Sequence, residues 1–276
     1  MTPVSLDALA AMIPDGSLVA IPPDNSLTPN ALARAMVRAG KRNLRLLGVP
    51  ISGFASEILI GAGCATSIQT SAVTLGEAGM APRFSARLRA GEIAVTDATC
   101  PAIHTMLQAA EKGVPFMPLR GIIGSDILAH RTDWKVIDNP FADGGDPIVL
   151  LPALSPDYAL FHAVMADPEG NVYVGRRHEL ATIAHAAKAA IVTVERMTDI
   201  NLLEDERYAA GTISAAYVEA VAVAERGCWP SAMLDEYPSD PAHIAEYARM
   251  AKTADGFQAW LDRYVYSLPT TRAAAE

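Results

Sequence analysis

Residues 17–49 read SLVAIPPDNSLTPNALARAMVRAGKRNLRLLGV and alternate between two kinds of segment. The short apolar runs 17–21 and 44–49 are predicted strands, because runs without polar alternation are typical of strands buried on both faces. Residues 29–39 between them have helical spacing, begin at Thr28-Pro29 and end before Gly40, which are common helix start and stop signals. The stretch therefore predicts a strand–helix–strand unit with parallel strands.

The same alternation continues along the chain. Further strands are predicted at 65–73, 93–97, 115–119, 148–151, 158–165, 171–175, 190–195 and 217–225, the last as an edge or late strand. Helices are predicted at 82–90, 101–111, 178–188 and 241–265, with Gly256 interrupting the last one. Repeated βα units predict an α/β fold with a mostly parallel sheet covered by helices. We expect a single domain over residues 1–276, with C-terminal helices at about 241–266 and a frayed end at 268–276.

Composition narrows the class of function. Charged residues make up 19% of the chain, less than the roughly 25% of a typical globular protein, which indicates that part of the surface is covered. A net charge of −9 argues against a nucleic-acid or membrane-surface protein. Three cysteines without a CxxC pair predict a reducing compartment. With no signal-peptide pattern and no apolar run of about 20 residues, we expect a cytoplasmic protein that does not bind the membrane.

Common catalytic and ligand-binding motifs are absent from the sequence. It contains no G-x-G-x-x-G, Walker, G-x-S-x-G or H-E-x-x-H pattern. His178 and His185 would share a helix face, but no carboxylate completes a metal site between them, so we expect no bound metal.

A longer pattern is more specific. Residues 113–126 read GVPFMPLRGIIGSD, followed by ADPEGN at 166–171, TVER at 193–196, GCWP at 227–230, and then Tyr237 and Asp240. In this order they resemble the A (α) subunits of family I coenzyme A transferases, in the glutaconate-type branch. The resemblance covers about residues 15–266 and implies an open α/β/α sandwich.

The resemblance also implies a reaction and a partner. In this family a glutamate carboxylate attacks an acyl-CoA, and an enzyme-CoA thioester forms and passes CoA to a second acid. In two-chain members that glutamate belongs to the B subunit. The implied partners are a β subunit, in an α2β2 complex, and the substrates acyl-CoA and a carboxylic acid. Coenzyme A would be a substrate, with no permanently bound cofactor.

Candidate site residues follow from the same comparison. Residues 76–80, around Glu77, resemble the E-x-G segment of B subunits, so Glu77 either lines an interface or site, caps a helix at the surface, or acts as nucleophile or base. Arg120 follows a predicted strand, where it would meet a substrate carboxylate or a CoA phosphate, or else pair within the Asp126 loop. Ser125 or Asp126 is predicted to cap a helix, with ligand contact as an addition.

The sequence departs from the family in two places. Pro22 and Pro23 stand in a loop that is glycine-rich in many A subunits, so Asp24, Asn25 and Ser26 would supply polar side chains instead of close backbone approach. Cys100 stands where relatives carry Gln, Asn or Glu, and a Gln there would help to hold the thioester oxygen in an oxyanion-type role. A thiol is a weak donor, so we expect Cys100 to be a small buried side chain, with a nucleophile at a helix start as the alternative.

Three functions therefore stay open. The first is the transferase A subunit. The second is a CoA-thioester hydrolase on the same scaffold, including the ring-opening type of steroid catabolism, which both departures favour. The third is a non-catalytic homologue. Transfer of label from acyl-CoA to an acceptor acid separates the first from the second.

Overall fold

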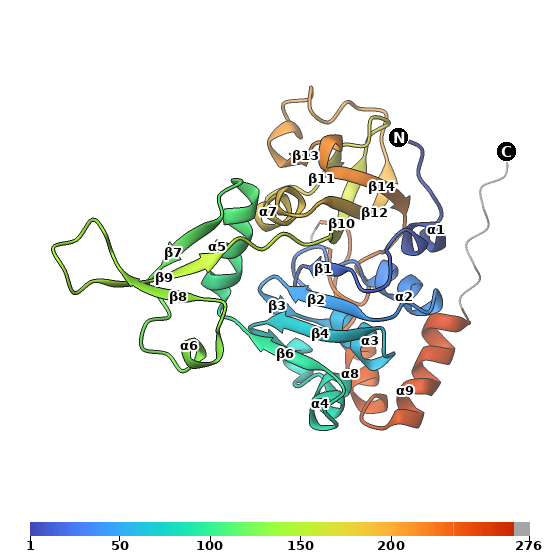
Figure 1. The fold of residues 1–276 in the computed structure, drawn as a ribbon. Helices are drawn as coiled ribbons and strands as arrows, with labels where there is room; N and C mark the ends of the chain where they lie inside the picture. The colour runs from blue at the N-terminus through green and yellow to red at the C-terminus, as the bar shows by residue number, and fades with distance from the viewer. Residues whose placement is uncertain (234, 268–276) are drawn as a thin grey trace.

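A nine-stranded, mostly parallel sheet forms the centre of the protein (Figure 1). The structure is a computed structural model and describes residues 1–233 and 235–267; the predicted frayed end at 268–276 lies outside this part of the chain. The parallel strands are β1 (Leu18–Ile21), β2 (Leu44–Gly48), β4 (Ala65–Thr70), β6 (Ala94–Asp97), β10 (Tyr158–Ala166), β12 (Ala189–Met197) and β14 (Val218–Val223). Two short antiparallel strands, β11 (Val172–Tyr173) and β13 (Thr212–Ile213), extend from the end of β10.

Helices cover both faces of this sheet. One face packs against α1 (Leu6–Ala11), α2 (Asn30–Arg38), α3 (Phe54–Gly61), α4 (Pro82–Arg89), α8 (Pro241–Met250) and α9 (Ala254–Leu261). The other face packs against α5 (Cys100–Glu111) and α7 (His178–Ala186). Strand β1 serves both cores, since Val19 and Ile21 lie in the first and Ala20 in the second. The predicted α/β/α arrangement is confirmed.

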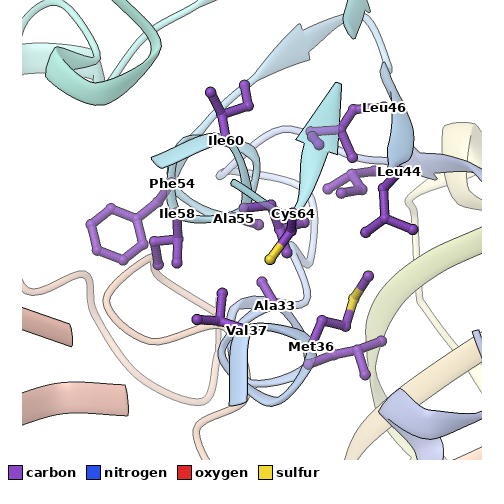
Figure 2. Packing of buried hydrophobic residues seen from close by; sticks show 14 of the residues in the cluster. Ala33, Met36, Val37, Leu44, Leu46, Phe54, Ala55, Ile58, Ile60 and Cys64 are labelled. Atoms are coloured by element: carbon purple, nitrogen blue, oxygen red, sulfur yellow. The ribbon is translucent and has the colours of Figure 1, made fainter. Parts of the chain in front are cut away.

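The first core is closely packed between α2, α3 and β2. Figure 2 shows Met36 and Val37 of α2 near Phe54 of α3 and Leu44 of β2, and all four are buried. Cys64 lies in the same cluster, where burial raises the pKa of its thiol to about 11. Cys64 is therefore an inert apolar group of this core.

A separate three-stranded antiparallel sheet projects from the main body (Figure 1). It consists of β7 (Phe116–Leu119), β9 (Pro147–Pro152) and β8 (Lys135–Asp138), with the short helix α6 (Ile127–His130) in the β7–β8 connection. The strands predicted at 115–119 and 148–151 thus exist, but their assignment to the parallel sheet was wrong. Pro118 lies within β7, and proline is tolerated there because β7 is an edge strand.

The C-terminal helices differ in one detail from the prediction. The break falls at residues 251–253, and Gly256 lies in the first turn of α9, where its amide donates to Oγ1 of the capping residue Thr253 (3.1 Å). A Cβ atom at Gly256 would lie 2.1 Å from the carbonyl oxygen of Met250, so glycine is required there for close approach and does not end the helix. A π-helical turn over Asp262–Tyr266 follows α9.

The remaining elements are short. Strands β3 (Ile51–Ser52) and β5 (Ala72–Val73) pair in parallel, and 3₁₀ turns occupy Gly76–Ala78, Ala209–Gly211 and Ala215–Tyr217. Across residues 1–233 and 235–267, every helix is too short or too polar to cross a bilayer.

Candidate functional site

The strand order reverses between β1 and β10. From β1 the sheet continues through β2, β4 and β6 to one edge, and from β10 through β12 and β14 to the other. In open parallel sheets ligands bind outside the carboxyl ends of the strands at such a reversal. The segment after β1 lies at this reversal, as shown by the hydrogen bond from the amide of His162 in β10 to the carbonyl oxygen of Leu27 (2.8 Å). We therefore take this edge as the candidate site.

Asp24 lies at the start of α3. Its Oδ1 and Oδ2 accept hydrogen bonds from the amide of Phe54 at 3.0 and 3.1 Å. A Cβ atom at Gly53 would lie 2.3 Å from this carboxylate, so only glycine lets the two segments meet. Burial raises the pKa of Asp24 to about 6, although the hydrogen bonds from Phe54 and Ser231 lower it. A carboxyl with this pKa can exchange protons near neutral pH.

The raised pKa predicts how Asp24→Asn changes stability with pH. Between its unfolded value of 3.8 and about 6, the folded protein binds more protons than the unfolded chain, so this group lowers the free energy of unfolding as pH rises. Asparagine keeps an acceptor for the Phe54 amide without the charge. We expect Asp24→Asn to be more stable than the parent at pH 8, where the parent carries a charged carboxylate that burial disfavours. The gain should be about 1–2 kcal/mol, because solvent partly screens a half-buried carboxylate.

Urea denaturation of both proteins at pH 8 and pH 4 measures this effect. The difference should shrink towards pH 4, where the carboxyl of the parent is protonated in the folded state. An equal difference at both pH values would contradict the assignment.

The neighbours of Asp24 divide between internal and exposed positions. Ser26 is buried, and its hydroxyl donates to Oε1 of Glu179 in α7. Asn25 is exposed. Of the three polar side chains predicted to replace a glycine-rich loop, Asp24 and Ser26 thus tie the loop to α3 and α7, and Asn25 faces solvent.

Glu195, at the carboxyl end of β12, is the centre of a polar cluster that the sequence prediction missed as a site. Its Oε1 lies 2.8 Å from Nε2 of His162 and accepts from the Tyr237 hydroxyl (2.8 Å) and the Gly227 amide (3.1 Å). Its Oε2 accepts from the Arg226 amide (2.7 Å). Burial raises the pKa of Glu195, but the hydrogen bonds outweigh burial and hold it at about 2. The TVER, GCWP and Tyr237 segments of the family pattern meet here. Their joint occurrence in the sequence was the signal that could have identified this cluster.

The ADPEGN segment forms a turn after β10 around the buried side chain of Asp167. The Asp167 carboxylate accepts from the amides of Gly170 and Asn171 (both 2.9 Å), from Nδ2 of Asn171 (2.8 Å) and from the Leu202 amide (3.1 Å). Oδ1 of Asn171 accepts from the Ala215 amide (2.8 Å). Gly170 has a φ of +98°, which favours glycine. This part of the family pattern therefore has a structural role, because it ties β11 to the segments near 202 and 215.

Cys100 and Glu77 follow other strands of the parallel sheets. Cys100 opens α5 directly after β6, as predicted, and the Thr99 hydroxyl caps the helix by accepting from the Ala102 amide (3.3 Å). The expectation of a buried Cys100 was wrong: the side chain is exposed, because the first turn of α5 stands at the outer strand of the sheet. Glu77 is also exposed, in the 3₁₀ turn after β5. Both are open to a ligand or partner.

Arg120 lies away from the main sheet edge, contrary to the prediction. It follows β7 of the projecting sheet, and its guanidinium pairs with Asp146 at 2.6 Å. An internal ion pair therefore exists, but with Asp146 rather than within the Asp126 loop. The side chain is 63% exposed, so the pair contributes little stability.

Ser125 and Asp126 occupy the start of α6. Asp126 is at the N-cap position, as predicted, but it has a helical backbone, and neither its side chain nor the Ser125 hydroxyl makes a capping hydrogen bond. Within this short helix, the amides of Leu128 and Ala129 donate to the backbone carbonyls of Ser125 and Asp126 (3.3 and 3.1 Å). Beyond α6, Nη1 of Arg131 donates to the carbonyl oxygen of Asp97 (3.0 Å), which connects the projecting sheet to the end of β6.

Comparison with known proteins identifies the scaffold. Residues 4–224 match the family model described as Coenzyme A transferase. The chain is 29% identical to the A subunit of glutaconate CoA-transferase from Acidaminococcus fermentans, over 95% of this chain and 87% of the relative. The crystal structure of glutaconate coenzyme A-transferase from that organism matches with a TM-score of 0.89 and 27% identity, over 98% of this chain and 90% of that one.

Other relatives carry different names. The chain is 28% identical to the A subunit of 3-oxoadipate CoA-transferase from Pseudomonas knackmussii, over 94% of this chain and 91% of the relative. It is 29% identical to the cholesterol ring-cleaving hydrolase IpdA subunit of Rhodococcus jostii, over 86% and 82%. An uncharacterized protein of Archaeoglobus fulgidus is 30% identical over 84% of this chain, which spans only 52% of that protein. By the family model, these relatives and the shared fold, this chain belongs to the Coenzyme A transferase family, among relatives named as A subunits.

Proposed function

We propose that this chain is the α subunit of a CoA transferase that moves CoA between an acyl-CoA and a carboxylic acid. The observation that carries the proposal is the similarity to the A subunit of glutaconate CoA-transferase over 95% of the chain. The fold supports it, because ligands of open parallel sheets bind at the carboxyl edge where the strand order reverses, which here is between β1 and β10.

The nucleophile would come from a β subunit. A partner glutamate attacks the thioester carbonyl and releases CoA thiolate, which then attacks the resulting anhydride to give a glutamyl-CoA thioester and the free acid. A second acid reverses these steps and leaves as the new acyl-CoA. Two carboxylates at the carboxyl edge of the sheet, Asp24 and Glu195, are engaged in hydrogen bonds within this chain. This supports a nucleophile that comes from the partner subunit.

Trapping the thioester tests this assignment. The chain is coexpressed with the proposed β subunit, incubated with acyl-CoA, reduced with borohydride and digested for mass spectrometry. The expected product is a reduced glutamate on the partner, at the same yield in the Glu77→Gln complex as in the parent. A reduced Glu77, or loss of trapping in Glu77→Gln, would place the nucleophile on this chain instead.

A hydrolase is the second candidate, and one observation favours it. Pro22 and Pro23 replace glycines of the family loop, and the neighbouring Asp24 has a pKa of about 6, which suits a base that takes a proton from water. The Rhodococcus jostii relative is named as a ring-cleaving hydrolase subunit. If the thioester is the bond that is hydrolysed, the complex would release free CoA without an acceptor acid.

The projecting sheet predicts how the isolated chain behaves in solution. Phe141 is 96% exposed, Val136 54% and Phe116 48%, and all three belong to this sheet or its β8–β9 loop. Exposed apolar side chains on a sheet that projects from the main body mark it as an interaction site. We expect the pure chain to self-associate and the β subunit to suppress this, as measured by sedimentation velocity. The double variant Phe141→Ser/Val136→Thr should sediment as monomer; monodisperse parent monomer at high concentration would contradict the prediction.

A further inference from the structure

Arg34 is a buried cation without a nearby carboxylate. It lies one turn into α2, is 6% exposed, and its Nη1 donates to the carbonyl oxygen of Trp229 (3.1 Å). Within residues 1–233 and 235–267, no carboxylate oxygen comes within 4.0 Å of its guanidinium nitrogens. Burial, and then the like charge of Arg38, lower the pKa of Arg34 to about 10, so it stays protonated at neutral pH. A buried charge without a counterion is unfavourable.

The guanidinium faces a hollow of about 430 Å³. The hollow lies between α2, the turn after β14, the start of α8 and the C-terminal π-helical turn, and it is lined by Arg34, Glu225, Arg226, Trp229, Asp240 and Tyr264. The Trp229 ring is held in place, because its Nε1 donates to Oδ2 of Asp240 (3.1 Å) and it packs at a tilt of 41° against His243, with 4.1 Å between ring centres. The Arg34 guanidinium lies over the same ring, 5.2 Å from its centre. The hollow thus combines a buried cation with two aromatic walls.

The charged groups of the lining balance, with Arg34 and Arg226 against Glu225 and Asp240, but neither carboxylate lies within 4.0 Å of the Arg34 guanidinium nitrogens. The Asp240 carboxylate is already engaged, since Oδ1 accepts from the His243 amide (2.9 Å) at the start of α8. Burial, and then the nearby Arg34, lower the pKa of His243 to about 4, so it is neutral at pH 7. Arg226 adds a second cation at the wall, and α2 has no acidic residue in its first turn. Glu225 and Asp240 oppose a doubly charged anion.

We propose that this hollow binds a small monocarboxylate with a flat apolar body. The carboxylate would accept hydrogen bonds from the Arg34 guanidinium, whose planar donors match carboxylate geometry. The body would lie against Trp229 and Tyr264, which prefer apolar or aromatic partners. Such a site needs neither a thioester nor the β subunit, so it does not depend on the proposed transfer reaction.

Calorimetric titration of the full chain with benzoate tests the site. Benzamide serves as the uncharged analogue of similar shape, and inorganic phosphate as the more highly charged anion. We expect benzoate to bind at least about tenfold more tightly than either. Equal affinity for benzoate and benzamide, or no benzoate binding at tens of millimolar (roughly the weakest affinity such a contact would give), would overturn the proposal.

Variants locate the bound carboxylate. Arg34→Gln should weaken benzoate binding at least about tenfold, and Arg38→Gln, in the same helix but paired with Asp7 at 2.7 Å, should change it less than about twofold. Arg226→Asn is the second variant, because the residue is exposed and asparagine tolerates its φ of +53°. It should weaken binding about threefold even if Arg34→Gln does not fold. Unchanged affinity in Arg226→Asn, and in Arg34→Gln if it folds, would overturn the proposal.

Discussion

Glu195→Ala is expected to lower the free energy of unfolding by about 3–5 kcal/mol, because it removes one partner of a buried charged network. The Glu195 side chain is 11% exposed, and its oxygens accept from the Tyr237 hydroxyl and from the amides of Arg226 and Gly227. Alanine would leave these donors, and the fully buried His162, without an acceptor. Urea denaturation at pH 7 measures the loss.

The same variant has a predicted pH profile. The pKa of Glu195 is about 2 when folded and 4.5 when unfolded, so its contribution is fully present above pH 4.5 and is lost as pH falls towards 2. The difference between parent and Glu195→Ala should therefore narrow below pH 4.5. Glu236→Ala is the matched control, since Glu236 pairs with Arg196 at the surface (2.7 Å) and should cost about 1 kcal/mol or less. If Glu195→Ala lowered the free energy of unfolding by as little as Glu236→Ala does, Glu195 would not be the centre of a stabilising buried network.

Asp167→Ala should destabilise the protein by a similar amount, about 3–5 kcal/mol. The Asp167 side chain is fully buried and accepts from Gly170, Asn171 and Leu202. Its loss leaves buried amides unpaired and releases the contact between the β10–β11 turn and the segment near 202.

A neighbouring residue provides the control for this experiment. Glu169 lies in the same turn, is exposed, and can be replaced by alanine without removing these bonds. Thermal and urea unfolding of Asp167→Ala, Glu169→Ala and the parent should place Glu169→Ala within about 0.5 kcal/mol of the parent. Comparable losses in the two variants would show that the turn, rather than the buried carboxylate, determines stability.

The sequence predicted the parallel sheet because its strands are apolar on both faces and alternate with helices. The sequence-based prediction missed elements whose buried residues do not recur with the period of a helix or a strand. Helix α3 reads FASEILIG and is buried throughout, so it lacks the polar face by which helices are recognised. Strand β8 reads KVID and is exposed at every position. The pairing of β7 with β9 was also missed, since apolar runs do not specify their partners.

The site was predictable as a region but not as a set of contacts. The loop at Asp24 and the start of α5 at Cys100 follow strands, and the βα pattern places such segments at the carboxyl edge. The contacts of Asp24 with Phe54, and of Glu195 with His162, join residues about 30 positions apart on different elements. Such contacts depend on the packing of those elements, which composition and spacing do not determine.

Transfer of CoA to an acceptor acid is tested most directly by following CoA itself. A complex of this chain with the proposed β subunit is incubated with acyl-CoA, with and without a labelled acceptor acid, and the products are separated by chromatography. We predict that labelled acyl-CoA forms only when the acceptor and both subunits are present, with little free CoA. Release of free CoA at the same rate without acceptor would contradict the transferase assignment and support the hydrolase.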